Sequence, residues 1–354
     1  MKTLFLISAM ALLSASCAKM SYLASQGVGQ VALEWNGRSN QEVLNDKKVK
    51  TEHKEKIKKI IDYKKFFYSY FGKEPTAIYE QTTFLKQPAV TYLVVASAQD
   101  EIQPLEHTFP VMGRFPYLGF FDVKDAKKFA KGLEKQEYET FIRPVFAYST
   151  LNQWIFDDNI LSSFFNYDDV ELAELVFHEL FHTIYFVKDE VSLNENLAQF
   201  FSRELVFEYF NYDNLQRARY ISRKSKEKKL TQKLVELTNQ LRERYGAKGR
   251  VPSEARQIRE TFMREVFKPQ MALVCDELEL ENCWPLKKSW NNARFAAFLT
   301  YESGQNEIEK LKKGRFSDLK LFFTYLVQEA DDFKAKSSGK KNESFESHLF
   351  SKSR

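Results

Sequence analysis

Two histidines and a glutamate stand close together in His178-Glu179-Leu180-Phe181-His182, which has the HExxH pattern. On a helix, residues four apart project from one face about one turn apart, so both imidazoles can bind one Zn²⁺. Glu179 then flanks the metal, where its carboxylate can act as a general base on a water instead of coordinating. The alternative, a pair of core histidines satisfied by hydrogen bonds, needs a chance match that arises about once in two hundred chains of this composition. The pattern therefore predicts a zinc site.

A catalytic zinc site needs a third protein ligand and an open fourth position. The enzymes with a third histidine six residues after the second are excluded, because Lys188 stands at that position and Tyr185 replaces the glycine between them. Farther along, Leu193-Asn194-Glu195-Asn196-Leu197-Ala198 begins a helix predicted to run to about residue 210. An antiparallel return after the His178 helix would bring the carboxylate of Glu195 to the site.

Glu195 also has a structural interpretation. Ser192-Leu193-Asn194-Glu195 is an S-x-x-E capping box, in which the glutamate would accept a hydrogen bond from the first amide of its own helix. Asp189, Glu190 and Glu204 are further carboxylates near the site in sequence. The residues alone leave these choices for the third ligand open.

Peptide hydrolysis needs a donor for the developing oxyanion as well as a general base. Tyr148, after the last predicted strand, and Tyr301, beyond Asn291-Asn292, are candidates. The chain has 17 tyrosines, so either of the two can equally be a packing residue.

The N-terminal residues 1–16 have the features of a secretory signal peptide. Lys2 is followed by the apolar run 4–13 and by small residues just before Cys17. A cysteine in that place is typical of a bacterial lipobox, although the usual leucine three positions earlier is Ser14 here. We expect an exported protein that faces the periplasm and is anchored in the membrane through a lipid on Cys17; the alternative is cleavage without lipid.

The composition excludes several classes of protein. A balance of 53 Lys+Arg against 48 Asp+Glu gives a net charge of +5, too small to indicate a nucleic-acid partner. Only 12 glycines and 9 prolines accompany 44% hydrophobic residues, which excludes wholesale disorder. Besides Cys17, only Cys275 and Cys283 are present; an exported chain can oxidise them, and two buried thiols are the alternative.

Hydrophobic periodicity predicts an α+β chain. An amphipathic helix is expected over 41–71, ending at Gly72, and β-rich pieces are expected over 77–79, 89–98, 117–121 and 140–148, with one helix over 123–137. After Asp168 the pattern is helical, and a Lys/Ser-rich tail over 334–354 is expected to be disordered. The predicted division is 17–150 for an N-terminal helix and small mixed sheet, and 151–333 for the helical zinc-site region of the same unit.

Beyond these patterns, the combination of HExxH with Asn194-Glu195-x-x-Ala198 resembles the gluzincin arrangement of HExxH plus NExxA. The short gap between the motifs resembles the bacterial putative aminopeptidase family, lipoproteins of the zincin clan. Weaker likenesses are the Cys17 start and the segments Phe109-Pro110, Gly113, Tyr117, Gly119-Phe120-Phe121, Ala147-Tyr148-Ser149-Thr150-Leu151 and Asn291-Asn292-Ala293. The resemblance implies a zincin-like fold, one Zn²⁺ held by His178, His182 and Glu195, and aminopeptidase activity.

One departure bears on where a peptide would be cut. The chain lacks the G-x-M-E-N string with which larger gluzincins bind the free amine of their substrate. Nearby acidic residues such as Asp157 and Asp158 could take its place, but no pattern singles them out. We therefore expect zinc-dependent peptide hydrolysis, with an aminopeptidase as the first choice. The alternatives are an endopeptidase with the same site and a non-catalytic envelope lipoprotein that zinc braces as a scaffold or binding module. The sequence does not predict the oligomeric state.

Overall fold

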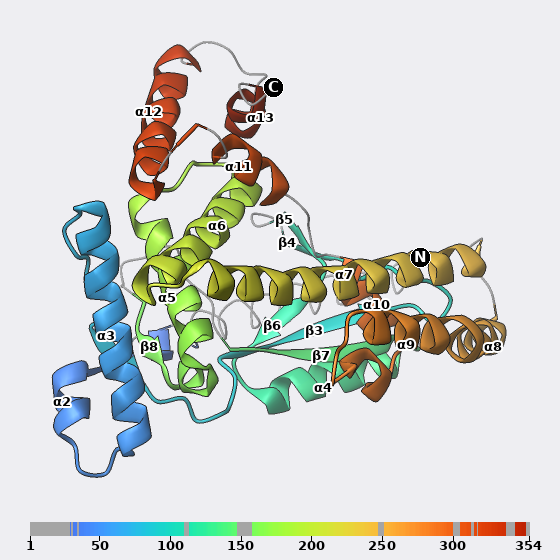
Figure 1. The fold of residues 1–354 in the computed structure, drawn as a ribbon. Coiled ribbons are helices and arrows are strands. Elements are labelled where there is room, and N and C mark those ends of the chain that lie inside the picture. The colour runs from blue at the N-terminus through green and yellow to red at the C-terminus, as the bar shows by residue number, and fades with distance from the viewer. Residues whose placement is uncertain are drawn as a thin grey trace, which may run out of the picture. The chain divides into compact units, whose positions relative to one another are not determined.

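The computed structural model describes residues 29, 31–33, 35–109, 113–146, 158–246, 251–299, 305–312, 315–316, 318–337 and 344–351 (Figure 1). Cys17, Tyr148, Asp157 and Tyr301 lie outside these ranges. The chain forms two compact units, each built from three segments. We call Met1–Ala32, Gln87–Phe146 and Ala218–Tyr301 the sheet unit, and Leu33–Lys86, Ala147–Arg217 and Glu302–Arg354 the histidine unit.

The sheet unit contains three antiparallel strands in the order β6-β3-β7: Leu118–Phe120, Thr91–Ser97 and Glu139–Val145. Side chains alternate between the faces of a strand. Val94 accordingly belongs to the apolar cluster of α4 (Val123–Glu134), while its neighbour Val95 faces the alanines of α10 (Asn292–Leu299). The expected strands over 89–98, 117–121 and 140–148 and the helix after residue 122 are thus confirmed within the described residues. The hairpin of β4 (His107–Phe109) and β5 (Gly113–Phe115) was not predicted.

Helices supply the rest of the sheet unit. They are most of α7 (Asn214–Tyr245), α8 (Pro252–Phe262), the π-helical turn η2 (Met263–Phe267), α9 (Lys268–Glu277), the 3₁₀ turn η3 (Trp284–Lys287) and α10. Four leucines of α7, spaced three or four residues apart on one face, are buried in one cluster with Phe262 and Phe267: Leu230, Leu234, Leu237 and Leu241. Cys275 and Cys283 form a disulfide, with their Cα atoms 5.7 Å apart. The pair is therefore oxidised in the structure and does not consist of two buried thiols.

Asn292 joins these helices to the sheet. Its side chain is fully buried, and its Oδ1 accepts hydrogen bonds from Tyr245 Oη and Arg259 Nη1, both at 2.8 Å. Its Nδ2 donates to the carbonyls of Ala98 at 3.1 Å and Gln99 at 2.9 Å. All polar atoms of a buried amide must find partners, so the asparagine pair singled out in the sequence has a structural role at Asn292.

The histidine unit carries a second small sheet in the order β1-β2-β8: Arg38–Ser39, Gln81–Thr83 and Ile160–Leu161. It is mixed, with β1 antiparallel and β8 parallel to β2. Around it lie α2 (Asn40–Asn45), α3 (Thr51–Phe71), the 3₁₀ turn η1 (Ser162–Asn166), α5 (Asp169–Ile184) and α6 (Val191–Tyr209). In Figure 1, α5 and α6 lie side by side and α3 runs along α5.

Two expectations for this unit are wrong. The single helix over 41–71 is interrupted between α2 and α3, although Gly72 ends it as predicted, with a φ of 60°. The strand expected over 77–79 is a turn, in which Tyr79 has a left-handed φ of 63°. A non-glycine residue in that conformation cannot continue a strand. The α+β class itself is confirmed, and the zincin-like fold stays a prediction.

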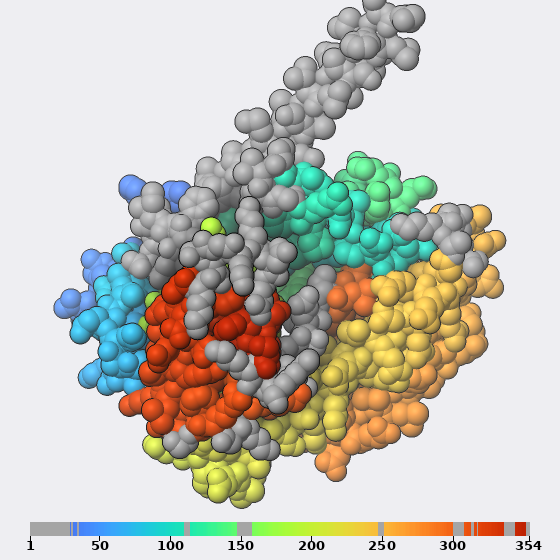
Figure 2. Space-filling view, turned by 90° about the horizontal axis from the view of Figure 1, so that it is seen from above, coloured from blue at the N-terminus to red at the C-terminus, as the bar shows by residue number. Residues whose placement is uncertain are grey.

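The chain end also differs from the expected disordered tail. The last segments form α11 (Gln305–Lys312), α12 (Leu319–Ser337) and α13 (Phe345–Ser351), and Figure 2 shows α12 and α13, in red, lying against each other. Phe345 and Leu349 are four residues apart and buried, and Glu190 Oε1 accepts a hydrogen bond from the amide of Phe345. This apolar pair is too short to stand out in a Lys/Ser-rich sequence. No helix among the described residues is long and apolar enough to cross a membrane.

Candidate metal centre

The helix that carries both histidines begins at a capping box. Asp168 Oδ1 accepts a hydrogen bond from the amide of Glu171 at 2.8 Å, and the Glu171 carboxylate accepts one from the amide of Asp168 at 3.3 Å. The cap fixes where α5 begins and so which residues share a face. Val176 and Leu180 are fully buried, which leaves His178 and His182 projecting from one side of α5.

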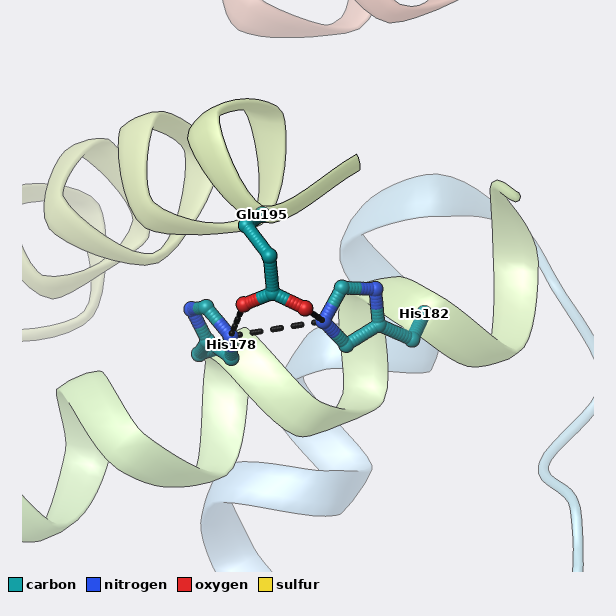
Figure 3. Close-up of side chains that lie close together, drawn as sticks. All are labelled: His178, His182 and Glu195. Atoms are coloured by element: carbon teal, nitrogen blue, oxygen red, sulfur yellow. Dashed lines mark hydrogen bonds and ion pairs between the residues drawn. The ribbon is translucent and has the colours of Figure 1, made fainter. Parts of the chain in front are cut away.

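The second helix brings a carboxylate to the same place. α6 begins at Val191, one residue before Ser192, and no side chain caps it. Because Ser192 is already inside the helix, it cannot form a capping box with Glu195. The capping interpretation is therefore wrong, and the Glu195 side chain is free to point across to α5, as Figure 3 shows.

Three ligand atoms converge between α5 and α6. His178 Nε2 lies 3.2 Å from Glu195 Oε2, His182 Nε2 lies 3.5 Å from Glu195 Oε1, and the two Nε2 atoms are 3.3 Å apart (Figure 3). Ligand atoms about 2.0–2.1 Å from a tetrahedral zinc ion lie about 3.3 Å from one another. Among the described residues, these three form the group of His, Cys, Asp and Glu side chains that could hold a metal ion.

The electrostatics of the group favour a cation. Burial disfavours protonation of His178, but the hydrogen bond to Glu195 and the charges of Glu179 and Glu195 outweigh it and raise the pKa of His178. Burial and the charge on His178 lower the pKa of His182, whereas the hydrogen bond from His178 lowers the pKa of Glu195. A neutral His182 and an ionised Glu195 are the protonation states in which these side chains bind metals, and a bound metal ion would displace the proton that the raised pKa favours on His178.

The group also remains accessible. The side chains of Glu195, His178 and His182 are 52%, 23% and 3% exposed, so one side of the triad is open. Within the described part of the chain, Glu195 has no lysine or arginine as an ion-pair partner. Two imidazole nitrogens and a carboxylate thus face one another without a lysine or arginine from the described residues, and this N₂O set fits zinc.

A family model described as "Putative aminopeptidase" matches residues 21–342. The chain belongs to the Putative aminopeptidase family. The match includes α5, α6 and the turn between them, and it ends before α13. Neither a curated protein nor a solved structure matches the chain.

The other carboxylates that the sequence offers as third ligands lie outside the group formed by His178, His182 and Glu195 in this family member. Asp189 occupies the turn between α5 and α6 with a left-handed φ of 66°, and Glu190 binds the amides of α13. Glu204 pairs with Arg203 at 3.1 Å. Tyr148 and Tyr301, proposed as oxyanion donors, lie outside the described residues, as does Asp157, while Asp158 is buried and its carbonyl accepts a hydrogen bond from the amide of Tyr79.

Two tyrosines beside α5 were missed. Tyr68 Oη is 2.8 Å from Thr183 Oγ1, on the residue that follows His182. Tyr79 is buried, and its burial, together with the nearby charge of Glu179, raises the pKa of its phenol. The Tyr68 contact depends on how α3 packs against α5, and the place of Tyr79 depends on how the chain turns after Gly72. No sequence pattern around Tyr79 indicates that turn.

The sequence contains Asn194 in the NExxA pattern but does not indicate its structural role. Asn194 is 1% exposed, its Oδ1 accepts a hydrogen bond from the amide of Val187 at 2.9 Å, and its Nδ2 donates to the carbonyl of Val187 at 2.7 Å. This pair of bonds ties the start of α6 to the chain leaving α5. Asn194 is therefore a positioning residue for its neighbour Glu195, which the NExxA pattern already contained.

We expect Asn194→Ala to lower the free energy of unfolding by about 1–3 kcal/mol, because the buried amide of Val187 loses its partner and the Val187 carbonyl keeps only the 3.3 Å bond from the amide of Glu190. Zinc affinity should fall as well, since Glu195 loses its fixed position. Urea unfolding and zinc titration measure the two effects. The matched control is Asn196→Ala, whose side chain makes one long bond of 3.4 Å to Ser192 Oγ. Equal zinc affinity in both variants would contradict the positioning role.

Proposed function

We propose that this chain is a zinc-dependent aminopeptidase. The observation that carries the proposal is the convergence of His178, His182 and Glu195 within 3.5 Å of one another, with Glu179 next to a ligand but outside the ligand group. Membership of the Putative aminopeptidase family supports a peptide as the substrate.

In this proposal His178, His182 and Glu195 hold the metal ion. The chemistry that zinc supplies when bound is Lewis acidity toward a water and toward the scissile carbonyl. The Glu179 carboxylate takes the proton of the attacking water and passes it to the leaving amine. Glu179 is only 9% exposed, so its carboxylate is shielded from bulk solvent while it holds the proton. Tyr148 or Tyr301 remains the proposed oxyanion donor.

A chelator experiment tests the function. Purified protein should hydrolyse aminoacyl-fluorophores, lose this activity after treatment with a chelator, and regain it when zinc is restored. Hydrolysis of N-blocked peptides alone would favour an endopeptidase with the same site. Full zinc occupancy without hydrolysis of either substrate would favour the non-catalytic scaffold.

We also propose that the protein works at the bacterial envelope, anchored through Cys17. The disulfide between Cys275 and Cys283 supports an oxidising compartment, because such bonds are rare in the cytosol. Mass spectrometry of the membrane fraction should find a diacylglyceryl group on Cys17. A mature protein that begins at Ala18 or later would exclude the anchor.

A further inference from the structure

A concave surface lies within the histidine unit, formed by β1, α2, α3 and the chain that follows α3. It is a groove with a volume of about 600 Å³, a size common among ligand sites. The argument depends on six of its lining residues: Lys64, Lys65, Tyr68, Lys73, Pro75 and Tyr79. The three metal-ligand candidates are not among the residues that line it.

The groove has an excess of positive charge. The Lys64 side chain is only 12% exposed, and among the described residues its ion-pair partner is Glu80, 3.4 Å away and itself 65% exposed. An ammonium group has three donor hydrogens, so a shielded Lys64 keeps capacity for an anion. Lys65 and Lys73 have no ion-pair partner in the described part of the chain. One glutamate therefore faces three lysines.

The floor of the groove is apolar and fixed. The rings of Tyr68 and Tyr79 are buried, with 1% and 3% of each residue exposed. Tyr68 Oη is held by Thr76 and Thr183, both at 2.8 Å, and the Tyr79 carbonyl accepts a hydrogen bond from Asn40 at 2.8 Å. A floor held by these bonds needs little ordering when a ligand binds, which favours affinity.

We propose that this groove, called the lysine groove, binds a peptide segment in which an acidic side chain stands beside an aromatic or aliphatic residue. The carboxylate pairs with Lys64 and is attracted by Lys65 and Lys73, while the apolar side chain lies against Pro75, above the buried rings of Tyr68 and Tyr79. Charge complementarity and the apolar floor together select this occupant over a purely anionic ligand. Binding in the groove does not use the three metal-ligand candidates, and it adds to the proposed function a surface for acidic peptides.

The test uses full-length protein carrying Glu179→Gln, so that the peptide stays intact. The probe is a fluorescent, N-acetylated and C-amidated peptide of alternating Glu and Phe, which has no free terminus. Fluorescence anisotropy should show saturable binding that weakens as salt increases. Lys64→Met, which keeps an apolar stem, and the exposed variant Lys73→Met should each weaken binding by about 10-fold. The matched control is Lys127→Met on the exposed side of α4.

Three outcomes would overturn the lysine groove. They are the absence of saturable binding, equal affinity of the lysine variants and the Lys127→Met control, and equal affinity for the peptide with Gln in place of Glu. A fourth result, displacement of the peptide by inorganic phosphate at constant ionic strength, would also overturn the proposal, because it would show a general anion site. Because binding is measured without turnover and can be repeated after chelation, these outcomes are independent of whether the zinc peptidase proposal holds.

Discussion

Glu179→Gln should lower peptidase turnover by a factor of about 10²–10⁴ while the protein keeps its zinc. The amide has nearly the size and polarity of the carboxylate, but it cannot accept the proton of the attacking water. The expected retention of metal follows from the geometry, because Glu179 is outside the group formed by His178, His182 and Glu195. Steady-state kinetics and elemental analysis of the same preparation measure both quantities.

Glu171→Gln is the matched control for this experiment. It makes the same substitution on the same helix, at a capping-box position where glutamine is accepted, so turnover should stay close to that of the wild type. Normal turnover in Glu179→Gln would remove the proposed base. Loss of zinc from Glu179→Gln would instead make Glu179 part of the metal centre.

Glu195→Gln should weaken zinc binding, and it should leave the proposed base Glu179 in place. A charged ligand becomes a neutral amide, so zinc affinity should fall by at least the factor of about 10–100 that follows loss of a supporting residue around a metal. Competition with a chromophoric chelator measures this affinity. Glu171→Gln again serves as the control, since it changes a glutamate in a true capping box and should leave zinc affinity unchanged. Unchanged affinity in Glu195→Gln would return the search for a third ligand to the residues outside the described ranges.

The sequence predicts those parts of the site that depend only on the spacing of residues along one helix. His178 and His182 share a face because they are four residues apart on a helix, and Asp168 caps that helix as its sequence indicates. Glu195 had two interpretations, because S-x-x-E fits a cap equally well. The structure distinguishes them through two residues of register, since α6 begins at Val191 and a cap by Ser192 would need it to begin at Leu193.

The positioning contacts could not be predicted, because they depend on the path of turns. The bonds between Asn194 and Val187 form only if the chain reverses through Asp189 in a left-handed conformation. The contact of Tyr68 with Thr183 joins residues far apart in sequence, on α3 and α5. Periodicity identifies the buried face of a helix, but it does not say which other helix will cover that face.

In the fold, too, local sequence patterns predict single elements but not how those elements pack together. The leucine spacing of α7 and the alternation in β3 follow from local sequence, and both elements form where expected. The assembly of each unit from three separate segments is a property of long-range packing. Short strands such as β1 and β8, with two residues each, are held by their neighbours and carry no detectable pattern of their own.

The most direct test of the central claim is the zinc content of purified protein measured by elemental analysis. We predict one zinc ion per chain in the wild type and in His53→Ala, which changes a histidine that packs against Phe165 away from the triad. The double variant His178→Ala/His182→Ala should contain no zinc above background. Equal zinc content in the wild type and the double variant would contradict the metal centre.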